Sequence, residues 1–194
     1  ECLTNMGYEV TLLTDEMLEK SDLSQFNTII TGIRAYNTRE RIKFYQPRLL
    51  EYVNNGGTLI VQYNVSFGLQ TNNIGPYPFT IGNRRITDEQ APLNFIDGSH
   101  RLINFPNKIT QKDFDGWVQE RGLYFAENWD DKFVPILSGN DPGESELKGG
   151  LLVAEYGKGV FIYSGLAWFR QLPAGVPGAY RIFVNMISGG MFNE

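Results

Sequence analysis

The sequence has very few of the side chains from which disulfides, zinc sites and most hydrolytic centres are built. Cys2 is its single cysteine and His100 its single histidine. One cysteine excludes a disulfide framework and a cysteine-based zinc site, and one histidine excludes zinc hydrolase designs that use two or three imidazoles. At most one Ser–His–carboxylate arrangement is possible. We therefore expect neither a metal site nor a cofactor.

Long hydrophobic runs and an excess of positive charge are also missing. The longest apolar runs are far shorter than the ~20 residues that cross a bilayer as a helix, so we expect no membrane span. The chain carries 17 Lys and Arg against 22 Asp and Glu, a net charge of −5, with no basic block. This charge gives nucleic-acid binding little electrostatic support, so nucleic acid is not an expected partner.

What remains is the composition of an ordinary globular domain. The 194 residues contain 42% hydrophobic and 20% charged side chains, and a chain of this length fits one domain. It begins Glu-Cys-Leu-Thr-Asn-Met-Gly, which reads as the end of a helix capped by Gly7. We expect a piece of a longer protein whose first strand precedes residue 1.

Hydrophobic patterns predict alternating strands and helices in the first third of the chain. The expected strands are 8–13, 28–32 and 58–63, and the expected helices are 14–19 and 39–54. Arg34–Thr38 is expected to be a loop, and Pro47 is expected to kink or divide the second helix. This β-α-β-α-β order predicts an α/β fold with a mostly parallel sheet.

The rest of the chain is less regular. Residues 64–98 are rich in Asn, Gly, Pro and Thr and are expected to form a long irregular insertion with one short strand near 78–81. Further expected elements are a helix at 110–120, a strand at 133–137, a hairpin of 151–156 with 159–163, and a last helix at 178–187.

Three phrases carry a resemblance to a known family. They are Ile30-Thr-Gly-Ile-Arg-Ala-Tyr-Asn37, Asp113-Phe-Asp-Gly-Trp-Val-Gln-Glu-Arg-Gly-Leu-Tyr-Phe125 and Gly165-Leu-Ala-Trp-Phe-Arg-Gln-Leu-Pro-Ala-Gly-Val-Pro-Gly-Ala-Tyr180. The chain resembles the class I glutamine-amidotransferase-like domain that follows the catalytic domain in bacterial LmbE-like (PIG-L family) deacetylases. The resemblance implies a flavodoxin-like three-layer sandwich over residues 1–194, with a mostly parallel central sheet and a C-terminal hairpin.

The same resemblance separates this domain from the chemistry of its family. The zinc-dependent deacetylase acting on N-acetyl sugars is the preceding domain, whose Ala-His-Pro-Asp-Asp type motif is not in this sequence. Amidotransferase relatives place a nucleophilic cysteine after the strand equivalent to 58–63, where this chain reads Tyr63-Asn64-Val65-Ser66. The resemblance therefore implies a non-catalytic accessory domain, with the deacetylase domain as its neighbour and an exported location.

The loops after the strands 28–32 and 58–63 are the first candidates for a ligand site. Ligands of open parallel sheets bind beyond the carboxyl ends of the strands. The candidate residues there are Arg34, Tyr36, Asn37, Tyr63 and Asn64. Arg34 suits an anionic group and Tyr36 suits stacking on a sugar. The alternative is structural, with Arg34 paired to a carboxylate and Tyr36 covering the core.

The sequence contains residues for two possible hydrolytic arrangements. Ser66 is the hydroxyl at the elbow position, and it needs His100 as a base with Asp97 or Asp113 as the orienting carboxylate. Its surroundings lack the Gly-x-Ser-x-Gly pattern. Alternatively, Asp113 and Glu120 lie seven residues apart on the expected helix and share a face, as an acid–base pair on a glycoside requires. The competing interpretation is a helix-capping Asp113 and a salt-bridged Glu120.

Aromatic side chains are concentrated in the second half of the chain. They are Trp117, Tyr124, Phe125, Trp129, Trp168 and Phe169, and Arg121 and Arg170 lie beside them. Of these, Trp117, Arg121 and Arg170 are candidates for ligand contacts, by stacking or bidentate hydrogen bonds. Core or interface packing explains the same residues.

Three functions follow from these residues. The first is a non-catalytic accessory domain that binds carbohydrate or docks a neighbouring domain. The second is a hydrolase in its own right, acting on a glycan or amide through Ser66–His100 or through the carboxylates. The third is an oligomerisation domain that forms a homo-oligomer.

Overall fold

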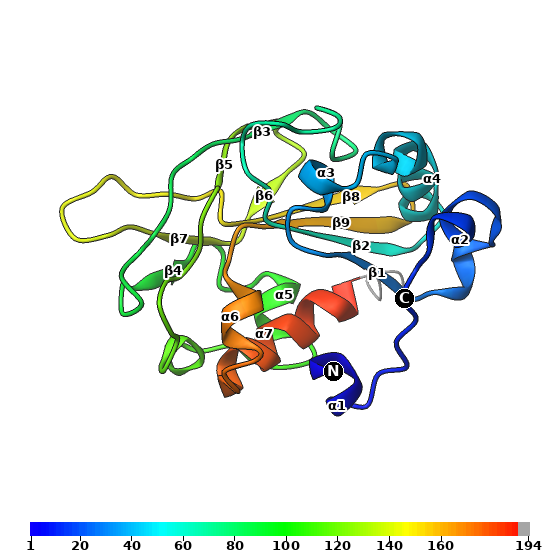
Figure 1. The fold of residues 1–194 in the computed structure, drawn as a ribbon. Helices are drawn as coiled ribbons and strands as arrows, with labels where there is room; N and C mark the ends of the chain where they lie inside the picture. Colours follow the sequence, from blue (N-terminus) through cyan, green and yellow to red (C-terminus); the bar gives the residue numbers. More distant parts are fainter. Residues whose placement is uncertain (190–194) are drawn as a thin grey trace.

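The structure, a computed structural model, describes residues 1–189 and is built on a five-stranded sheet (Figure 1). The strand order is β1-β2-β9-β8-β6. The bounds are β1 Thr28–Thr31, β2 Thr58–Gln62, β6 Val134–Pro135, β8 Leu151–Tyr156 and β9 Gly159–Ser164. The three strands at one side are parallel to one another, and β8 and β6 are antiparallel to their neighbours. The protein is therefore an α/β protein with a mixed sheet.

The parallel strands come from distant parts of the chain. Thr28 of β1 aligns with Thr58 of β2, and Thr58 in turn aligns with Val160 of β9. The expected parallel pairing of 28–32 with 58–63 is thus confirmed. Of the expected β-α-β-α-β series, both helices and the last two strands are present, and residues 8–13 are not assigned to a strand. The second neighbour of β2 in the sheet is β9. Strands β8 and β9 are joined through Gly157 and Lys158.

Helices cover both faces of the sheet. On one face, α4 (Ile42–Asn54) and α2 (Asp15–Lys20) pack over Leu59, Val61 and Phe161. On the other face, α7 (Pro177–Ile187) packs over Ile60 and Ile162, and α1 (Cys2–Asn5), α5 (Arg101–Asn104) and α6 (Trp168–Gln171) lie on the same side (Figure 1). Alternate residues of β2 therefore point into two separate hydrophobic clusters.

Two local predictions in the first third are corrected. Residues 35–38 form a short helix, α3 (Ala35–Thr38), where a loop was expected. Helix α4 runs through Pro47 without interruption. Pro47 lies inside the helix on its exposed side, where water can bond to the carbonyl that the missing N–H of proline leaves unpaired. The helix 14–19 is confirmed as α2, with the Thr14 hydroxyl accepting from the Met17 N–H.

The insertion is tied to the second half of the chain by two small sheets. β3 (Phe79–Ile81) pairs with β5 (Ala126–Trp129), and β4 (Leu93–Phe95) pairs with β7 (Leu137–Gly139). The short strand expected near 78–81 is confirmed as β3. The expected strand 133–137 is divided between β6 and β7, which belong to different sheets.

Two elements differ from their predictions. Tyr8–Leu13 is not assigned to any strand, although its composition favours one. The expected helix 110–120 is only a short 3-10 helix, η2 (Gln111–Phe114). A separate 3-10 helix, η1 (Leu23–Gln25), lies between α2 and β1. Thr110 and Asp113 do form the expected capping box. The helix ends at Phe114 because Asp115 is extended, with ψ of 144°. Gly116 and Gln119 then adopt left-handed backbone angles, with φ of 71° and 67°, so the helix does not resume.

The last helix agrees with its prediction, and α7 begins with Pro177 at its first turn. Within residues 1–189, no helix has the length and apolar character needed to cross a membrane.

Candidate functional site

The carboxyl ends of β1, β2 and β9 meet at one edge of the sheet, and the loops that leave them lie together. The segments that follow the strands are residues 32–38, which include α3, residues 63–68, and residues 165–171, which include α6. They are adjacent because the three strands are parallel neighbours with ends in register, Gln62 opposite Ser164. We call this region the carboxyl edge. In open α/β sheets, this is the edge at which ligands bind.

Two asparagines fasten the first two loops to each other. The buried Asn64 accepts from the Tyr36 N–H at 2.9 Å and donates to the Gln62 carbonyl at 2.9 Å. Asn37 accepts from the Val65 N–H at 3.0 Å and donates to the Phe67 carbonyl at 2.9 Å. The side chains of Asn64 and Asn37 thus hydrogen-bond to backbone groups, and these bonds fix the shape of the two segments.

Arg34, the residue directly before α3, has a backbone conformation that is uncommon for its residue type. Its φ is 57°, in the left-handed region, and its N–H donates to the Tyr63 carbonyl at 2.8 Å. Such a conformation costs about 1 kcal/mol or more for a residue with a Cβ, and it persists where the surroundings impose it. The Arg34 side chain is exposed at the carboxyl edge.

Tyr63 lies at the centre of a row of aromatic and arginine side chains, in which it is stacked on Tyr124 and tilted by 39° against Phe169. Its ring is 6.0 Å from that of Tyr124, with 9° between the planes, and 5.2 Å from that of Phe169. The guanidinium of Arg85 lies 5.6 Å from the Tyr124 ring, and that of Arg170 lies 5.0 Å from the Phe169 ring. We call these five residues, Arg85–Tyr124–Tyr63–Phe169–Arg170, the Arg–aromatic stack. Cationic groups cover the ring faces at both of its ends.

Tyr124 is the second strained residue at this edge. Its φ is 54°, and its carbonyl accepts from the Tyr163 hydroxyl at 2.6 Å. Burial raises the pKa of Tyr163 above the range usual for tyrosine, so this hydroxyl remains a donor at all physiological pH values. Of the three residues other than glycine with positive φ in residues 1–189, two are therefore at the carboxyl edge.

Arg170 also holds Glu120 in place. Its Nε lies 2.7 Å from Glu120 Oε1, and the Glu120 side chain is almost fully buried. Gln171 accepts from the Val118 N–H at 2.8 Å and donates to the Glu120 carbonyl at 3.2 Å. Glu120 thus fixes the segment before Tyr124 against α6, which is the salt-bridged role considered from the sequence.

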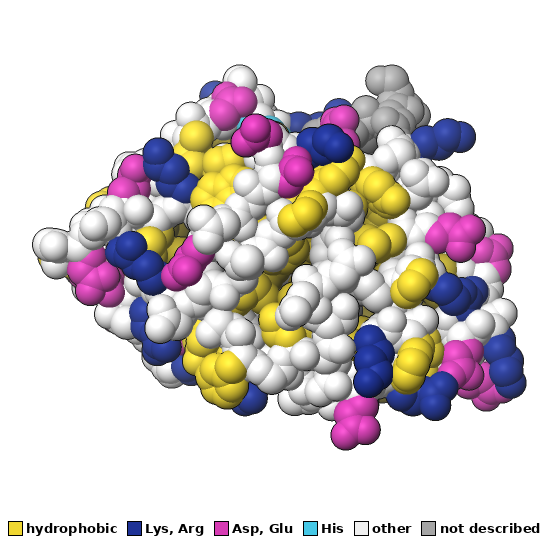
Figure 2. All heavy atoms as spheres, turned by 90° about the horizontal axis from the view of Figure 1, so that it is seen from above, with side chains coloured by type: hydrophobic (Ala, Val, Ile, Leu, Met, Phe, Trp, Pro, Cys, Tyr) yellow, Lys and Arg dark blue, Asp and Glu magenta, His cyan; other side chains and the backbone are white. Residues whose placement is uncertain are grey.

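The surface above α3, α4 and the β3–β5 sheet exposes hydrophobic side chains in a band across its middle (Figure 2). Charged side chains lie mainly toward the margins of this view. Two exposed apolar residues come from the loops of the carboxyl edge, Ile33 after β1 and Phe67 after β2. The edge therefore combines apolar surface with exposed arginines.

Three predicted ligand residues lie in the interior instead. Tyr36 is fully buried. Trp117 donates from Nε1 to the Asp113 carbonyl at 3.1 Å and packs against Trp168. Arg121 is buried beside Trp117 and donates to the carbonyls of Ala91 and Phe114 at 2.9 and 2.6 Å. These three side chains are therefore enclosed and bond to groups inside the protein.

The Ser66–His100 arrangement is not assembled. Ser66 follows the carboxyl end of β2, which aligns with Ser164 at the end of β9. His100 instead lines a surface hollow together with Val160 and Glu155, at the opposite end of β9. The two side chains are separated by most of the length of a strand, about 3.3 Å per residue. Burial lowers the pKa of His100, and the nearby Asp97 and Glu155 carboxylates partly offset this.

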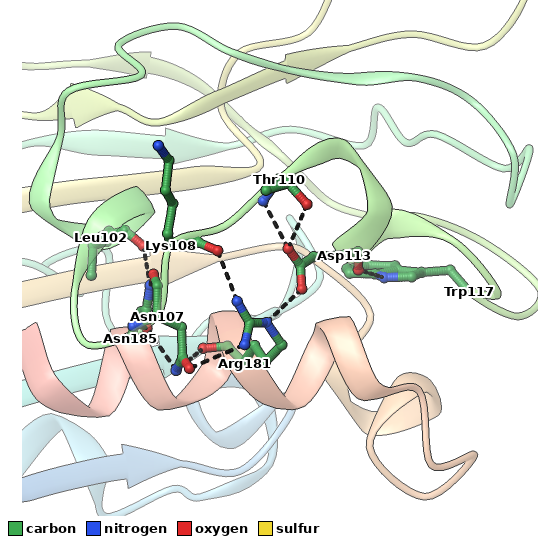
Figure 3. A network of polar contacts seen from close by, with 8 residues as sticks. All are labelled: Leu102, Asn107, Lys108, Thr110, Asp113, Trp117, Arg181 and Asn185. Carbon is green, nitrogen blue, oxygen red and sulfur yellow. Dashed lines mark hydrogen bonds and ion pairs between the residues drawn. The ribbon is translucent and has the colours of Figure 1, made fainter.

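The Asp113–Glu120 pair is not assembled either, because the two carboxylates pair with different arginines. Asp113 accepts from the Thr110 N–H at 2.7 Å and pairs with Arg181 Nε of α7 at 2.8 Å. Glu120 pairs with α6, and no helix connects the two carboxylates because η2 ends at Phe114. Figure 3 shows Asp113 and Arg181 in a network that also joins Asn107 and Asn185. The network attaches residues 102–117 to α7.

Among residues 1–189, no group of three or more His, Cys, Asp or Glu side chains has the arrangement of a metal site. The sequence pointed to the carboxyl edge through Arg34 and Tyr63. It did not single out Arg85, because an arginine inside an irregular insertion has no pattern that places it over a particular ring.

Comparisons with known proteins establish the fold alone. No family model and no curated protein sequence matches the chain. Among solved structures, the chain is similar to the cytoplasmic protein STM3548 from Salmonella typhimurium, with a TM-score of 0.62, 15% identity and coverage of 96% of this chain and 83% of that one. It is also similar to the cytoplasmic protein STM1381 from Salmonella typhimurium LT2, with a TM-score of 0.60, 11% identity and the same coverage.

A cold-adapted β-galactosidase from Rahnella sp. R3 aligns with 89% of this chain and 24% of its own, with a TM-score of 0.49 and 13% identity. That score is too low to support an argument. The chain shares its overall α/β fold with the two Salmonella proteins.

Proposed function

We propose that this chain is a non-catalytic accessory domain that binds carbohydrate at the carboxyl edge of its sheet. The observation that carries the proposal is the Arg–aromatic stack, which lies where ligands of parallel sheets bind and is flanked by backbone strain at Arg34 and Tyr124. Strain of this kind concentrates at ligand sites. Neither Ser66–His100 nor Asp113–Glu120 offers a competing catalytic centre.

The chemistry of the edge favours a sugar that carries a carboxylate. Within residues 1–189, Arg34 and Arg85 form no ion pair, and both are exposed. A guanidinium that rests on an aromatic face keeps its N–H edge available for bidentate binding of a carboxylate. Exposed apolar and aromatic surface beside it suits the C–H face of a sugar ring. We therefore place the carboxylate of the sugar at Arg34 and Arg85, and the sugar ring beside Tyr124 and Phe169.

We further propose the finer classification to which the sequence phrases point. The domain is flavodoxin-like, of the class I glutamine-amidotransferase type, and accompanies the deacetylase domain of an LmbE-like (PIG-L family) protein. The parallel β1-β2-β9 core with helices on both faces supports the flavodoxin-like arrangement. In such a protein the deacetylase domain supplies zinc chemistry, and this domain presents or retains the glycan.

The test is binding of defined oligosaccharides, measured by calorimetry and by NMR shifts. The probes are a hexuronate trisaccharide and a neutral N-acetylglucosamine trisaccharide. We expect Arg34→Gln and Arg85→Gln each to weaken hexuronate binding by about 1.5–3 kcal/mol, the range for a hydrogen bond to a charged group. Arg84→Gln is the matched control, because Arg84 is the exposed neighbour of Arg85 and its side chain donates to the Ser145 carbonyl.

Each outcome has a defined meaning. Binding of the neutral trisaccharide alone keeps the carbohydrate function but removes the acidic group from it. Absence of binding to either probe, in a folded protein, contradicts the function. A concentration-dependent dimer in light scattering together with no sugar binding favours the oligomerisation alternative.

A further inference from the structure

A surface hollow of about 340 Å³ lies at the end of the sheet opposite to the carboxyl edge, and three valines form its apolar floor. Val134 of β6 is paired with Val153 of β8. Val160 of β9 is paired with Glu155, which follows Val153 by two residues and therefore shares its face of the sheet. The volume is at the lower end of the range for small-molecule sites. The hollow therefore suits a small molecule with an apolar part.

Tyr77 forms a fixed wall of this hollow. Its hydroxyl donates to the Glu155 carbonyl at 3.1 Å, and its ring packs edge-on against the rings of Phe133 and Tyr156. The Lys132 ammonium lies 4.4 Å from the centroid of the Tyr77 ring. A cation–π contact of this kind holds the ammonium group beside the ring, and the N–H groups that point away from the ring can bind an anion. Tyr77 and Lys132 thus present a positive group at the hollow.

Glu155 supplies the opposite charge. Its side chain is exposed and lies on the same face of β8 as the buried Val153. Within residues 1–189, neither Glu155 nor Lys132 forms an ion pair. Two opposite charges that line one hollow without pairing with each other are suited to a ligand that carries both charges.

His100 adds a neutral polar group to the hollow. Its Nδ1 accepts from the Leu102 N–H at 3.2 Å, as the cap of α5. A nitrogen that accepts carries no proton, so the neutral imidazole has its proton on Nε2. Burial lowers the pKa of His100, which favours this neutral form at physiological pH. The side chains that line the hollow therefore carry one positive and one negative charge.

We infer that the hollow binds a small zwitterion, and that this ligand is a free amino acid with an aliphatic side chain. The ammonium group of the amino acid pairs with the Glu155 carboxylate, its carboxylate pairs with the Lys132 ammonium, and its side chain packs on the valine floor. A ligand with a single charge leaves one of the two protein charges without a partner. The inference does not depend on the proposed carbohydrate function, because the hollow and the carboxyl edge are at opposite ends of β9.

The test is an NMR titration that uses the single imidazole of the chain as its reporter. L-Leucine is the probe. Isocaproate has the same aliphatic chain and carboxylate without the ammonium group, and isoamylamine has the chain and the ammonium group without the carboxylate. The titration is carried out at about pH 7.5, above the ordinary imidazole pKa of 6.5, so that protonation of His100 does not move its signals. Calorimetry with the same three compounds measures the affinities independently of the reporter.

We expect leucine to shift the His100 signals in a saturable way. Isocaproate and isoamylamine are expected to bind at least about tenfold more weakly, because each lacks one charged hydrogen bond. Binding of either analogue as tightly as leucine overturns the inference. Leucine concentrations up to the limit of solubility that produce no saturable shift and no heat of binding also overturn it.

Two variants test whether leucine binds through the two charges of the hollow. Glu155→Gln and Lys132→Gln each remove one charge from an exposed side chain, so we expect the fold to be retained and leucine binding to weaken by about tenfold or more. In Glu155→Gln, leucine is then expected to bind no more tightly than isocaproate. In Lys132→Gln, it is expected to bind no more tightly than isoamylamine.

The matched controls lie on α4, which covers the other face of the sheet. Lys43→Gln removes an exposed ammonium that lies 5.3 Å from the centroid of the Phe44 ring, and Glu51→Gln removes an exposed carboxylate. We expect both controls to bind leucine as the unchanged protein does. An equal loss in the controls, or unchanged binding in Glu155→Gln or Lys132→Gln, contradicts the inference.

Discussion

The Tyr36 hydroxyl donates a hydrogen bond of 2.5 Å to Gln46 Oε1, and both side chains are buried. Gln46 in turn donates to the Ile74 carbonyl at 2.6 Å. This relay joins α3 to α4 and α4 to the insertion. Burial also raises the pKa of Tyr36 above the usual tyrosine range, so the hydroxyl stays protonated as a donor.

The first prediction is that Tyr36→Phe lowers the free energy of unfolding by about 1–2 kcal/mol, because Gln46 Oε1 is left without its buried donor. Urea denaturation measures this loss. Tyr77→Phe is the control, since the Tyr77 hydroxyl bonds to the Glu155 carbonyl at an exposed site, and we expect less than about 0.5 kcal/mol. Unchanged stability with weaker glycan binding would return Tyr36 to the ligand site.

The second prediction concerns Asp113, which a hydrolase would use in catalysis. Asp113→Ala removes the acceptor of the Thr110 N–H and the partner of Arg181, so we expect a loss of about 2 kcal/mol in unfolding free energy with unchanged glycan binding. The expected loss in unfolding free energy is moderate because the Arg181 side chain is 44% exposed. Asp115→Ala, two residues away and exposed, serves as the control. A stable variant that has lost a hydrolytic activity would support the hydrolase alternative.

The third prediction uses two glycines with opposite surroundings. A Cβ on Gly178 would lie 1.9 Å from the Asp113 carbonyl oxygen, which belongs to packed backbone and cannot easily move. We expect Gly178→Ala to destabilise the protein by about 3 kcal/mol, although alanine normally favours a helix. Gly32→Ala meets no atom within 4 Å, and we expect a change within about 0.5 kcal/mol. Similar midpoints for the two variants in thermal unfolding would refute this packing of α7.

The fourth prediction is that the single imidazole titrates below its ordinary pKa of 6.5. Burial favours the neutral form of His100 in the folded protein, so the unfolded chain takes up the proton more readily. The stability linked to this group is therefore complete above pH 6.5 and decreases as the pH falls below it.

An NMR titration of the imidazole proton signals measures this pKa directly, with the urea-unfolded chain as the reference. Asp97→Asn removes a carboxylate that raises the pKa of His100, so we expect the value to fall further in this variant. A folded-state pKa at or above 6.5 would disagree with the position of His100.

Local sequence patterns were sufficient where an element is stabilised by its own residues. The Thr14 cap, the β-branched run of β1 and the apolar stripe of α7 all predicted elements that the structure contains. The prediction was wrong at 110–120, where capping-box residues begin a helix that left-handed Gly116 and Gln119 do not continue. It also failed at Tyr8–Leu13, where a strand-forming sequence has no described partner strand.

The candidate site was predictable only in outline. The general rule for parallel sheets led to Arg34 and Tyr63, which lie at the carboxyl edge. Tyr36 is two residues from Arg34, yet the turn of α3 directs it into the core. Arg85 and Phe169 reach the stack only through long-range folding of the insertion and of α6, and no spacing in the sequence encodes that proximity.

The position of β9 has a consequence for how the protein is made. β9 is the central strand of the sheet, and its contact with β2 joins residues roughly one hundred positions apart in the chain, such as Thr58 and Val160. During synthesis, β1 and β2 emerge from the ribosome long before the strand that covers their exposed edge. The edge of β2 that pairs with β9 therefore stays unpaired until most of the domain has been translated.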